Sequence, residues 1–284
     1  LDVTEMRELI NLAGSSPIAG NRQSMKDGAT LRNWYASHSA IMGQTAVRLV
    51  QSGFTGPRDG ITPTCDEVLF DTFRPDHVVP DLGARWLLAD GYIKLYGCGR
   101  PIHAALDAVR QALAGAGEPS RWPRADDIAH IHIRGFKFIA FLNRRDIRSA
   151  FPTRFSTPSA VASVIVHRSQ GLECFDDAAA ADDTIHGLVA KIEMVEDDNY
   201  SAQFPAKQLC DVTITLKDGT VLSGHTDVIR GEPANPADPE EYKAKFFDIA
   251  RRAWPDERVA AIHAEAMRID EVEDMRALGG VAGL

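Results

Sequence analysis

The chain has 284 residues, of which 44% are hydrophobic and 25% are charged, a composition typical of globular proteins with one or two domains. A formal net charge of −9 disfavours non-specific binding to nucleic acid or to anionic membranes. No apolar run approaches the ~20 residues of a membrane span, and no signal peptide is recognisable. The four cysteines are widely spaced, which favours free thiols, so we expect a cytoplasmic protein.

Residues 1–115 predict helices. Asp2 and Glu5 form a capping-box pattern ahead of an apolar turn, and Thr64 with Glu67 repeats the pattern further along. Both pairs are therefore expected to begin helices.

Two longer helices are expected in the same region. Residues 38–53 place apolar side chains on one stripe, and Gly53 is a natural residue to end that helix. Residues 101–117 begin with Pro101 and end in small residues and glycine, as many helices do.

Residues 116–235 predict an α+β domain. Residues 127–135 alternate like a half-buried strand, and a helix capped by Ser156 or Thr157 follows. Two alternating runs flank Asp218-Gly219, which is a strong hairpin signal.

Residues 236–284 return to helical periodicity after a Pro-rich acidic connector. Residues 256–278 continue this periodicity, with apolar positions from Val259 to Val272, so a long final helix is expected. We predict an α+β protein in which residues 1–115 and 236–284 form a helical domain. Residues 116–235 form an inserted α+β lid domain with a mainly antiparallel sheet.

Two polar patterns favour ordinary structural roles over metal binding. His130 and His132 alternate with isoleucines, which favours solvent-facing histidines over a zinc site. Acidic runs at residues 176–177, 182–183 and 196–198 lack calcium-loop spacing, so we interpret them as solvated helix ends and turns. We expect no metal. Motifs of zinc proteases, P-loop NTPases, dinucleotide enzymes and serine hydrolases are absent from the sequence.

Lys94 lies in an apolar, aromatic stretch just before a glycine-broken turn that opens a helix. Together with Arg100 and His103 at that helix N-terminus, it would suit a carboxylate-rich ligand. The alternative is a surface lysine with its stem along apolar surface. Cys98 is a weaker candidate, a nucleophile without an identifiable base.

A second basic segment precedes the helix at residues 38–53. Arg32 and His38 flank two aromatic residues there, and an arginine is well suited to forked contact with a carboxylate. An ordinary basic, aromatic helix entry explains the same pattern equally well.

These segments, in this order, resemble the MmgE/PrpD family, which includes 2-methylcitrate dehydratase, cis-aconitate decarboxylase and iminodisuccinate epimerase. No single piece is decisive, but the ordered set spans nearly the whole chain. The stretches that carry the resemblance are residues 38–60, 91–109, 152–166, 211–224 and 233–250.

The resemblance implies a helical domain built from both ends of the chain, an inserted lid, and an active site in the cleft between them. Members are usually dimeric, need no organic cofactor or iron–sulfur cluster, and move a proton next to a carboxylate of a small di- or tricarboxylate. We therefore expect a cofactor-free hydro-lyase similar to 2-methylcitrate dehydratase. The alternatives are a decarboxylase or an epimerase of the same family.

The family's site residues carry over onto particular positions. Lys94 matches the lysine of a K-x-Y-x-C segment, with Tyr96, Cys98 and His103 in register, whereas Arg32 stands where the family commonly has a lysine. The resemblance implies a catalytic set and a substrate-binding set. The catalytic set is Lys94, His38 and His103, with a histidine pKa near neutrality; the substrate-binding set is Arg32, Arg100, Tyr96 and Ser156.

Family members are longer at the N-terminus, and the early helices that carry an active-site Asp and His have no counterpart in this sequence. We therefore expect a homodimer, or pairing with a chain that supplies this half. A further alternative is a non-catalytic partner subunit.

Overall fold

The computed structural model describes residues 1–17, 20, 23–24, 27–78 and 80–274. The final stretch of the expected last helix, from residue 275, lies outside the described residues. The chain forms two compact units, residues 1–90 and 91–284, and each is described by itself.

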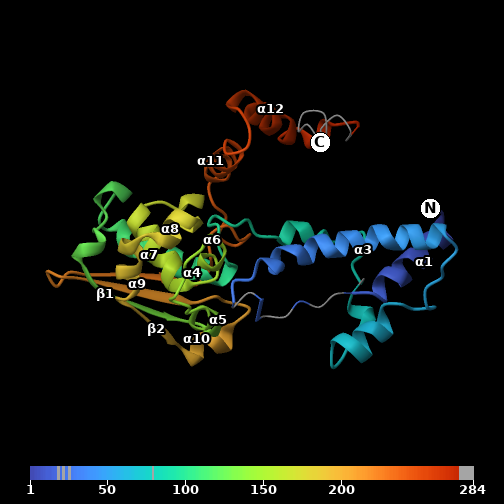
Figure 1. Cartoon of the computed structure of the whole chain (residues 1–284), viewed down its shortest axis with the longest axis horizontal. Coiled ribbons are helices and arrows are strands. Elements are labelled where there is room, and N and C mark those ends of the chain that lie inside the picture. Colours follow the sequence, from blue (N-terminus) through green and yellow to red (C-terminus); the bar gives the residue numbers. More distant parts are fainter. Residues whose placement is uncertain (18–19, 21–22, 25–26, 79, 275–284) are drawn as a thin grey trace. The chain divides into compact units, whose positions relative to one another are not determined.

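The first unit is built on two helices that pack against each other, α1 (Val3–Gly14) and α3 (Trp34–Gln51) (Figure 1). The predicted capping box of α1 is confirmed, because Asp2 Oδ1 accepts from the Glu5 amide at 2.8 Å and Glu5 Oε2 accepts from the Asp2 amide at 2.8 Å. α3 ends at Gln51, and Gly53, the expected glycine after the helix, has a φ of 84°. The Gly53 and Phe54 amides donate to the carbonyls of Val50 and Leu49, which is a Schellman ending.

The second expected capping box is wrong. Residues Thr64–Leu69 form one wide π-type turn whose preceding residue is Pro63, with no side-chain cap. The acceptor here is Asp59, whose carboxylate takes the amides of Ile61 and Thr62 at 3.0 and 2.9 Å. Single 3-10 turns follow at Pro75–His77 and Leu87–Asp90.

The second unit is built on a four-stranded mixed sheet with the order β2-β1-β3-β4. The pairs β1–β3 and β3–β4 are antiparallel, whereas β1–β2 is parallel. The strands are β1 (Ile128–Gly135), β2 (Ile192–Glu196), β3 (Cys210–Leu216) and β4 (Val221–Thr226). The predicted hairpin is confirmed, with Gly219 at a φ of 89° between β3 and β4.

One face of the sheet is covered by helices and the other carries polar side chains. Figure 1 shows α4 (Arg100–Ala114) and α7 (Thr157–His167) on the same side of the sheet, and α4 packs against β3 and β4. α4 approaches β4 closely because Gly224 has no side chain; a Cβ there would lie 2.0 Å from the Ala108 carbonyl oxygen. The expected division at residues 115 and 235 stays a prediction.

The polar face explains the His-x-His pattern. His130 and His132 point away from the buried isoleucines of β1, and His130 Nε2 lies 3.3 Å from Glu193 Oε2. The solvent-facing placement of these histidines is confirmed. Across the described residues, no three His, Cys, Asp or Glu side chains gather closely enough to hold a metal ion.

The acidic runs begin helices, as predicted. Asp176, Asp182 and Asp197 are N-caps of three short helices, and their carboxylates accept backbone amides one turn ahead. The short helices of this unit are α5 (Lys137–Phe141), α6 (Ala150–Thr153), α8 (Asp177–Ala181), α9 (Asp183–Val189) and α10 (Asp198–Gln203).

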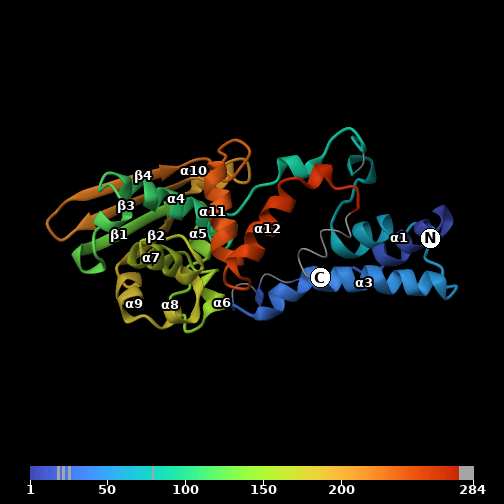
Figure 2. The same cartoon turned by 90° about the horizontal axis from the view of Figure 1, so that it is seen from above.

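Two helices follow the sheet, α11 (Pro239–Ala250) and α12 (Asp256–Ala266) (Figure 2). A capping box between Asp238 and Glu241 begins α11. α12 ends at Ala266, so the expectation of one continuous helix to Val272 is wrong; a separate 3-10 turn spans Ile269–Glu271.

Candidate functional site

The Lys94 segment, residues 93–99, is an irregular stretch that hydrogen bonds hold at both ends. The Ile93 amide donates to the Gly231 carbonyl at 2.9 Å, and the Gly99 amide donates to the Arg154 carbonyl at 2.7 Å. Leu95 and Tyr96 are buried, whereas the side chain of Lys94 is exposed. Lys94 therefore projects outward from a backbone that is anchored in the core.

The N-terminus of α4 directly follows the Lys94 segment, and its first-turn residues Arg100, Ile102 and His103 are buried. Gly99 is the N-cap of α4 and supplies no side-chain acceptor, so the first-turn amides depend on other partners. An amide-rich helix end with a positive dipole favours anions.

Arg100, an expected substrate-binding residue, is already engaged. Its Nη2 donates to Glu232 at 2.6 Å, its Nη1 donates to the Arg230 carbonyl at 3.3 Å, and its guanidinium lies 4.1 Å from the Tyr92 ring centroid. Glu232 therefore balances the charge of Arg100 within this unit.

His103 is fully buried, and its surroundings disfavour the protonated form of its ring. Its ring meets Tyr96 edge-on at 5.0 Å, and its Nδ1 lies 3.4 Å from Arg100 Nη1. Burial, followed by the charges of Arg100, Lys94 and Lys245, lowers the pKa of His103 to about 3, against a hydrogen bond with the Cys98 backbone that raises it. The ring is therefore neutral at pH 7, which differs from the expected pKa near neutrality. Among the described residues, its Nε2 has no hydrogen-bond partner.

Tyr96 and Asp107 form the buried support of the site. The Tyr96 hydroxyl donates to Asp107 Oδ1 at 2.7 Å, and Asp107 Oδ2 accepts the Arg230 amide at 2.8 Å. Burial is the main cause that raises the pKa of the Asp107 carboxyl, and it also raises the pKa of Tyr96. Tyr96 thus joins the Lys94 segment to α4 and to the loop after β4.

Ser156 and Cys98 have structural surroundings. Ser156 is the predicted N-cap of α7: its hydroxyl accepts the Ser159 amide at 3.1 Å and donates to the Arg144 carbonyl at 2.6 Å. Burial strongly raises the pKa of the Cys98 thiol, which argues against Cys98 as a thiolate nucleophile. All four cysteines are free thiols.

Lys245 on α11 was not anticipated from the sequence. Its ammonium donates to the Lys94 carbonyl oxygen, so the two lysines meet although 151 positions separate them. A lysine on an amphipathic helix resembles any solvated lysine, and no local pattern distinguishes this one.

Arg32 and His38 belong to the first unit. Arg32 is exposed in the 3-10 turn Thr30–Asn33, and His38 packs its ring against Trp34 at 4.6 Å. The recess in which Arg32 would meet Lys94 stays a prediction, because each unit is described by itself.

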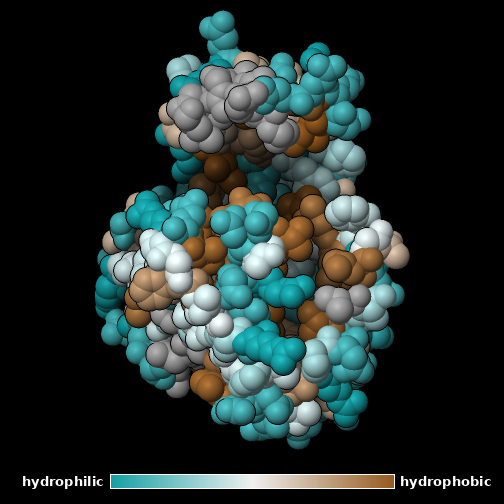
Figure 3. All heavy atoms as spheres, turned by 90° about the vertical axis from the view of Figure 1, so that its right-hand side faces the viewer, coloured by the Kyte–Doolittle hydropathy of each residue, from teal (hydrophilic) through white to brown (hydrophobic). Residues whose placement is uncertain are grey.

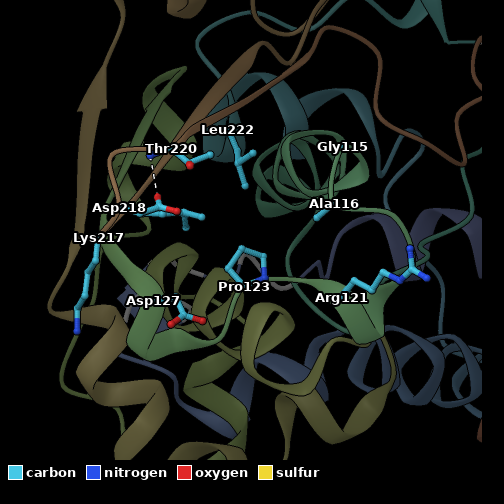
Figure 4. Close-up of a pocket in the computed structure, with 10 residues that line it drawn as sticks. Gly115, Ala116, Arg121, Pro123, Asp127, Lys217, Asp218, Thr220 and Leu222 are labelled. Atoms are coloured by element: carbon cyan, nitrogen blue, oxygen red, sulfur yellow. Dashed lines mark hydrogen bonds between the residues drawn. The ribbon is translucent and has the colours of Figure 1, made fainter.

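A pocket of about 470 Å³ lies near the far end of α4, beside the β3–β4 turn (Figure 4). Its acidic groups are held locally: Asp218 accepts the Thr220 amide and Asp127 accepts the Arg124 amide. In Figure 4 the side chains of Lys217 and Arg121 extend away from its centre. The 15 residues of α4, roughly 22 Å of helix, separate this pocket from the Lys94 end.

Comparison with known proteins identifies the class. Residues 96–270 match the MmgE/PrpD C-terminal domain. This match covers more than half of the chain, so the chain belongs to the MmgE/PrpD family. A curated relative is cis-aconitate decarboxylase of Mus musculus, 22% identical over 98% of this chain. The chain spans 57% of the length of that relative. No helix in the described ranges is both long and apolar enough to cross a bilayer.

Proposed function

We propose that the chain provides the carboxylate-binding side of a lyase active site that acts on a small di- or tricarboxylate without an organic cofactor. Membership of the MmgE/PrpD family and the distant likeness to cis-aconitate decarboxylase support a lyase. The observation that carries the proposal is Lys94. It is an exposed lysine on a core-anchored backbone just before the N-terminus of α4, and no described carboxylate forms an ion pair with it.

The proposed chemistry is removal of a proton from the carbon next to a carboxylate, with loss of a hydroxyl group as water from the neighbouring carbon. Negative charge then develops on that carboxylate, and a fixed cation lowers the barrier most where the charge grows. Lys94 supplies this cation, and Arg32 of the first unit is proposed as a second one. Proton transfer falls to His38, because a histidine with a pKa of about 3, such as His103, is a weak base.

Turnover of 2-methylcitrate and cis-aconitate by the chain tests this function directly. We expect Lys94→Met to lower kcat/KM at least a hundredfold with folding intact, and Lys243→Met to leave it within twofold. Lys243 is the matched control because it is exposed on α11 and pairs with Glu240. Equal activity of Lys94→Met and the unsubstituted chain would remove Lys94 from the mechanism. The product separates dehydration from decarboxylation and epimerisation.

A second candidate is a subunit that needs a partner chain to form its site. Large apolar side chains lie open to solvent in residues 1–90, including Leu82 at 84%, Trp86 at 78% and Leu88 at 92% exposure. Figure 3 shows apolar side chains at the surface among polar ones. Activity that appears only after a homologous partner is added would favour this candidate.

A further inference from the structure

Lys245 lies on the face of α11 that contacts the loop after β4. Glu241, one turn earlier on α11, forms an ion pair with Arg230. Residues four apart on a helix share a face, so this ion pair directs Lys245 toward the Lys94 segment, where it donates to the Lys94 carbonyl.

The charges of Lys94 and Lys245 act on the same place, the start of α4. Burial and then the Lys94 ammonium lower the pKa of Lys245, and both ammonium groups lower the pKa of His103. The same two charges oppose the rise in the pKa of the Cys98 thiol. The Lys245 ammonium contacts the Lys94 backbone, and Lys94 lies just before α4, so both cations belong to the start of this helix.

This pair of lysines is uncompensated, unlike the other cations nearby. Arg100 is neutralised by Glu232, and Lys243 pairs with Glu240 at 3.4 Å. Within the described part of the chain, no carboxylate forms an ion pair with Lys94 or with Lys245. Two neighbouring lysines without an acidic partner leave positive charge that a bound anion would balance.

We propose that Lys245 is a second carboxylate-binding cation of the Lys94 site, which would make the site selective for acids carrying more than one carboxylate. The inference rests on the proposed function of Lys94 and adds a binding residue to it. Each of the two ammonium groups can bind a different carboxylate of the same molecule. A monocarboxylate gains from only one such contact.

Binding of tricarballylate, an unreactive tricarboxylate, to the full chain tests this inference by isothermal titration calorimetry, with propionate as the monocarboxylate probe. We expect Lys245→Met to weaken tricarballylate binding about tenfold and to change propionate binding less. Lys245→Arg is expected to restore most of the affinity, and Lys243→Met to stay within twofold. Restoration by arginine separates a charge contribution from a purely structural one.

The outcomes distinguish this inference from the proposed function. If Lys94→Met weakens tricarballylate binding but Lys245→Met behaves like Lys243→Met, the inference is overturned and the proposed function stands. If the unsubstituted chain and Lys94→Met bind tricarballylate equally, or neither binds it, both are overturned.

If Lys245→Met does not fold, lysine NMR titration of the unsubstituted chain provides the decisive measurement. The pKa of Lys245 must rise when tricarballylate saturates the chain while that of Lys243 stays unchanged. A Lys245 pKa that does not respond to the ligand overturns the inference.

Discussion

At the scale of single residues, the site is defined by which polar groups are already engaged. Arg100, Tyr96 and Ser156 looked like ligand-binding residues in the sequence, yet each is bonded to neighbours in its own unit. Lys94 and Lys245 keep their charges uncompensated by any described carboxylate. Among the cations, the lack of a carboxylate partner therefore separates Lys94 and Lys245 from Arg100.

His103 provides a test of this electrostatic description through pH. Its pKa of about 3 in the folded chain lies below the ordinary histidine value, so the folded state binds fewer protons than the unfolded state. Its stabilising contribution is complete above about pH 6.5 and is lost as pH falls from there toward 3. We expect the free energy of unfolding to fall by about 2 kcal/mol more between pH 7 and pH 4.5 in the unsubstituted chain than in His103→Phe.

Urea denaturation followed by circular dichroism at the two pH values measures this difference. His130→Gln is the control, because His130 is exposed and its removal should leave the pH dependence of the unsubstituted chain in place. The same pH dependence in His103→Phe and His130→Gln would show that His103 is not the buried titrating group.

At the scale of elements, the close packing of α4 on the sheet fixes where the Lys94 end of the helix lies. Gly224 allows this approach, since any side chain would meet the backbone of α4 at Ala108 and Ala112. The loop after β4 then returns to the Lys94 segment through Gly231 and Ile93. Displacing α4 would therefore disturb both its packing on β4 and the position of the Lys94 segment.

We expect Gly224→Ala to lower the free energy of unfolding by about 3 kcal/mol, because the added methyl group meets backbone atoms that cannot move aside locally. Gly187→Ala in α9 is the matched control: an added Cβ there meets nothing within 4 Å, and the helix should gain about 0.5–1 kcal/mol. Urea denaturation of both variants provides the comparison. A Gly224→Ala change below 0.5 kcal/mol would show that α4 can be lifted from β4 at little cost.

Elements whose signals are local could be predicted from the sequence, whereas their long-range partners could not. The turn at Asp218-Gly219, the Ser156 cap and the acidic caps each depend on residues a few positions apart. The capping box at Thr64 failed because Asp59, outside the motif, satisfies the amides instead. The approach of Lys245 to Lys94 depends on tertiary packing that no short pattern encodes.

At the scale of the whole molecule, the buried core is distributed very unevenly between the two units. Among the described residues, Ala46 is the only buried apolar residue before Leu95, and the remaining buried apolar residues lie in the second unit. Apolar burial is the main source of folding free energy. Residues 1–90 should therefore be much less stable than residues 91–284.

Hydrogen exchange measured by mass spectrometry tests this asymmetry on the full chain. We expect amides of α4, β1 and β3 to be protected at least a thousandfold more strongly than amides of α1 and α3. Equal protection of α3 and α4 would contradict the description of residues 1–90 as a unit with little core of its own.

The exposed apolar side chains of residues 1–90 lead to a prediction about association. Leu82 and Leu88 are 84% and 92% exposed, and large apolar areas left open to water favour burial against another chain. We expect the chain to form dimers or larger species at tens of micromolar, and the double substitution Leu82→Glu with Leu88→Glu to shift sedimentation toward the monomer. Val221→Glu is the control, because Val221 is 58% exposed on β4, outside this region.

Association should also raise the hydrogen-exchange protection of residues 1–90 as the protein concentration increases. A chain that stays monomeric at these concentrations would instead require these side chains to be covered by something other than a second copy.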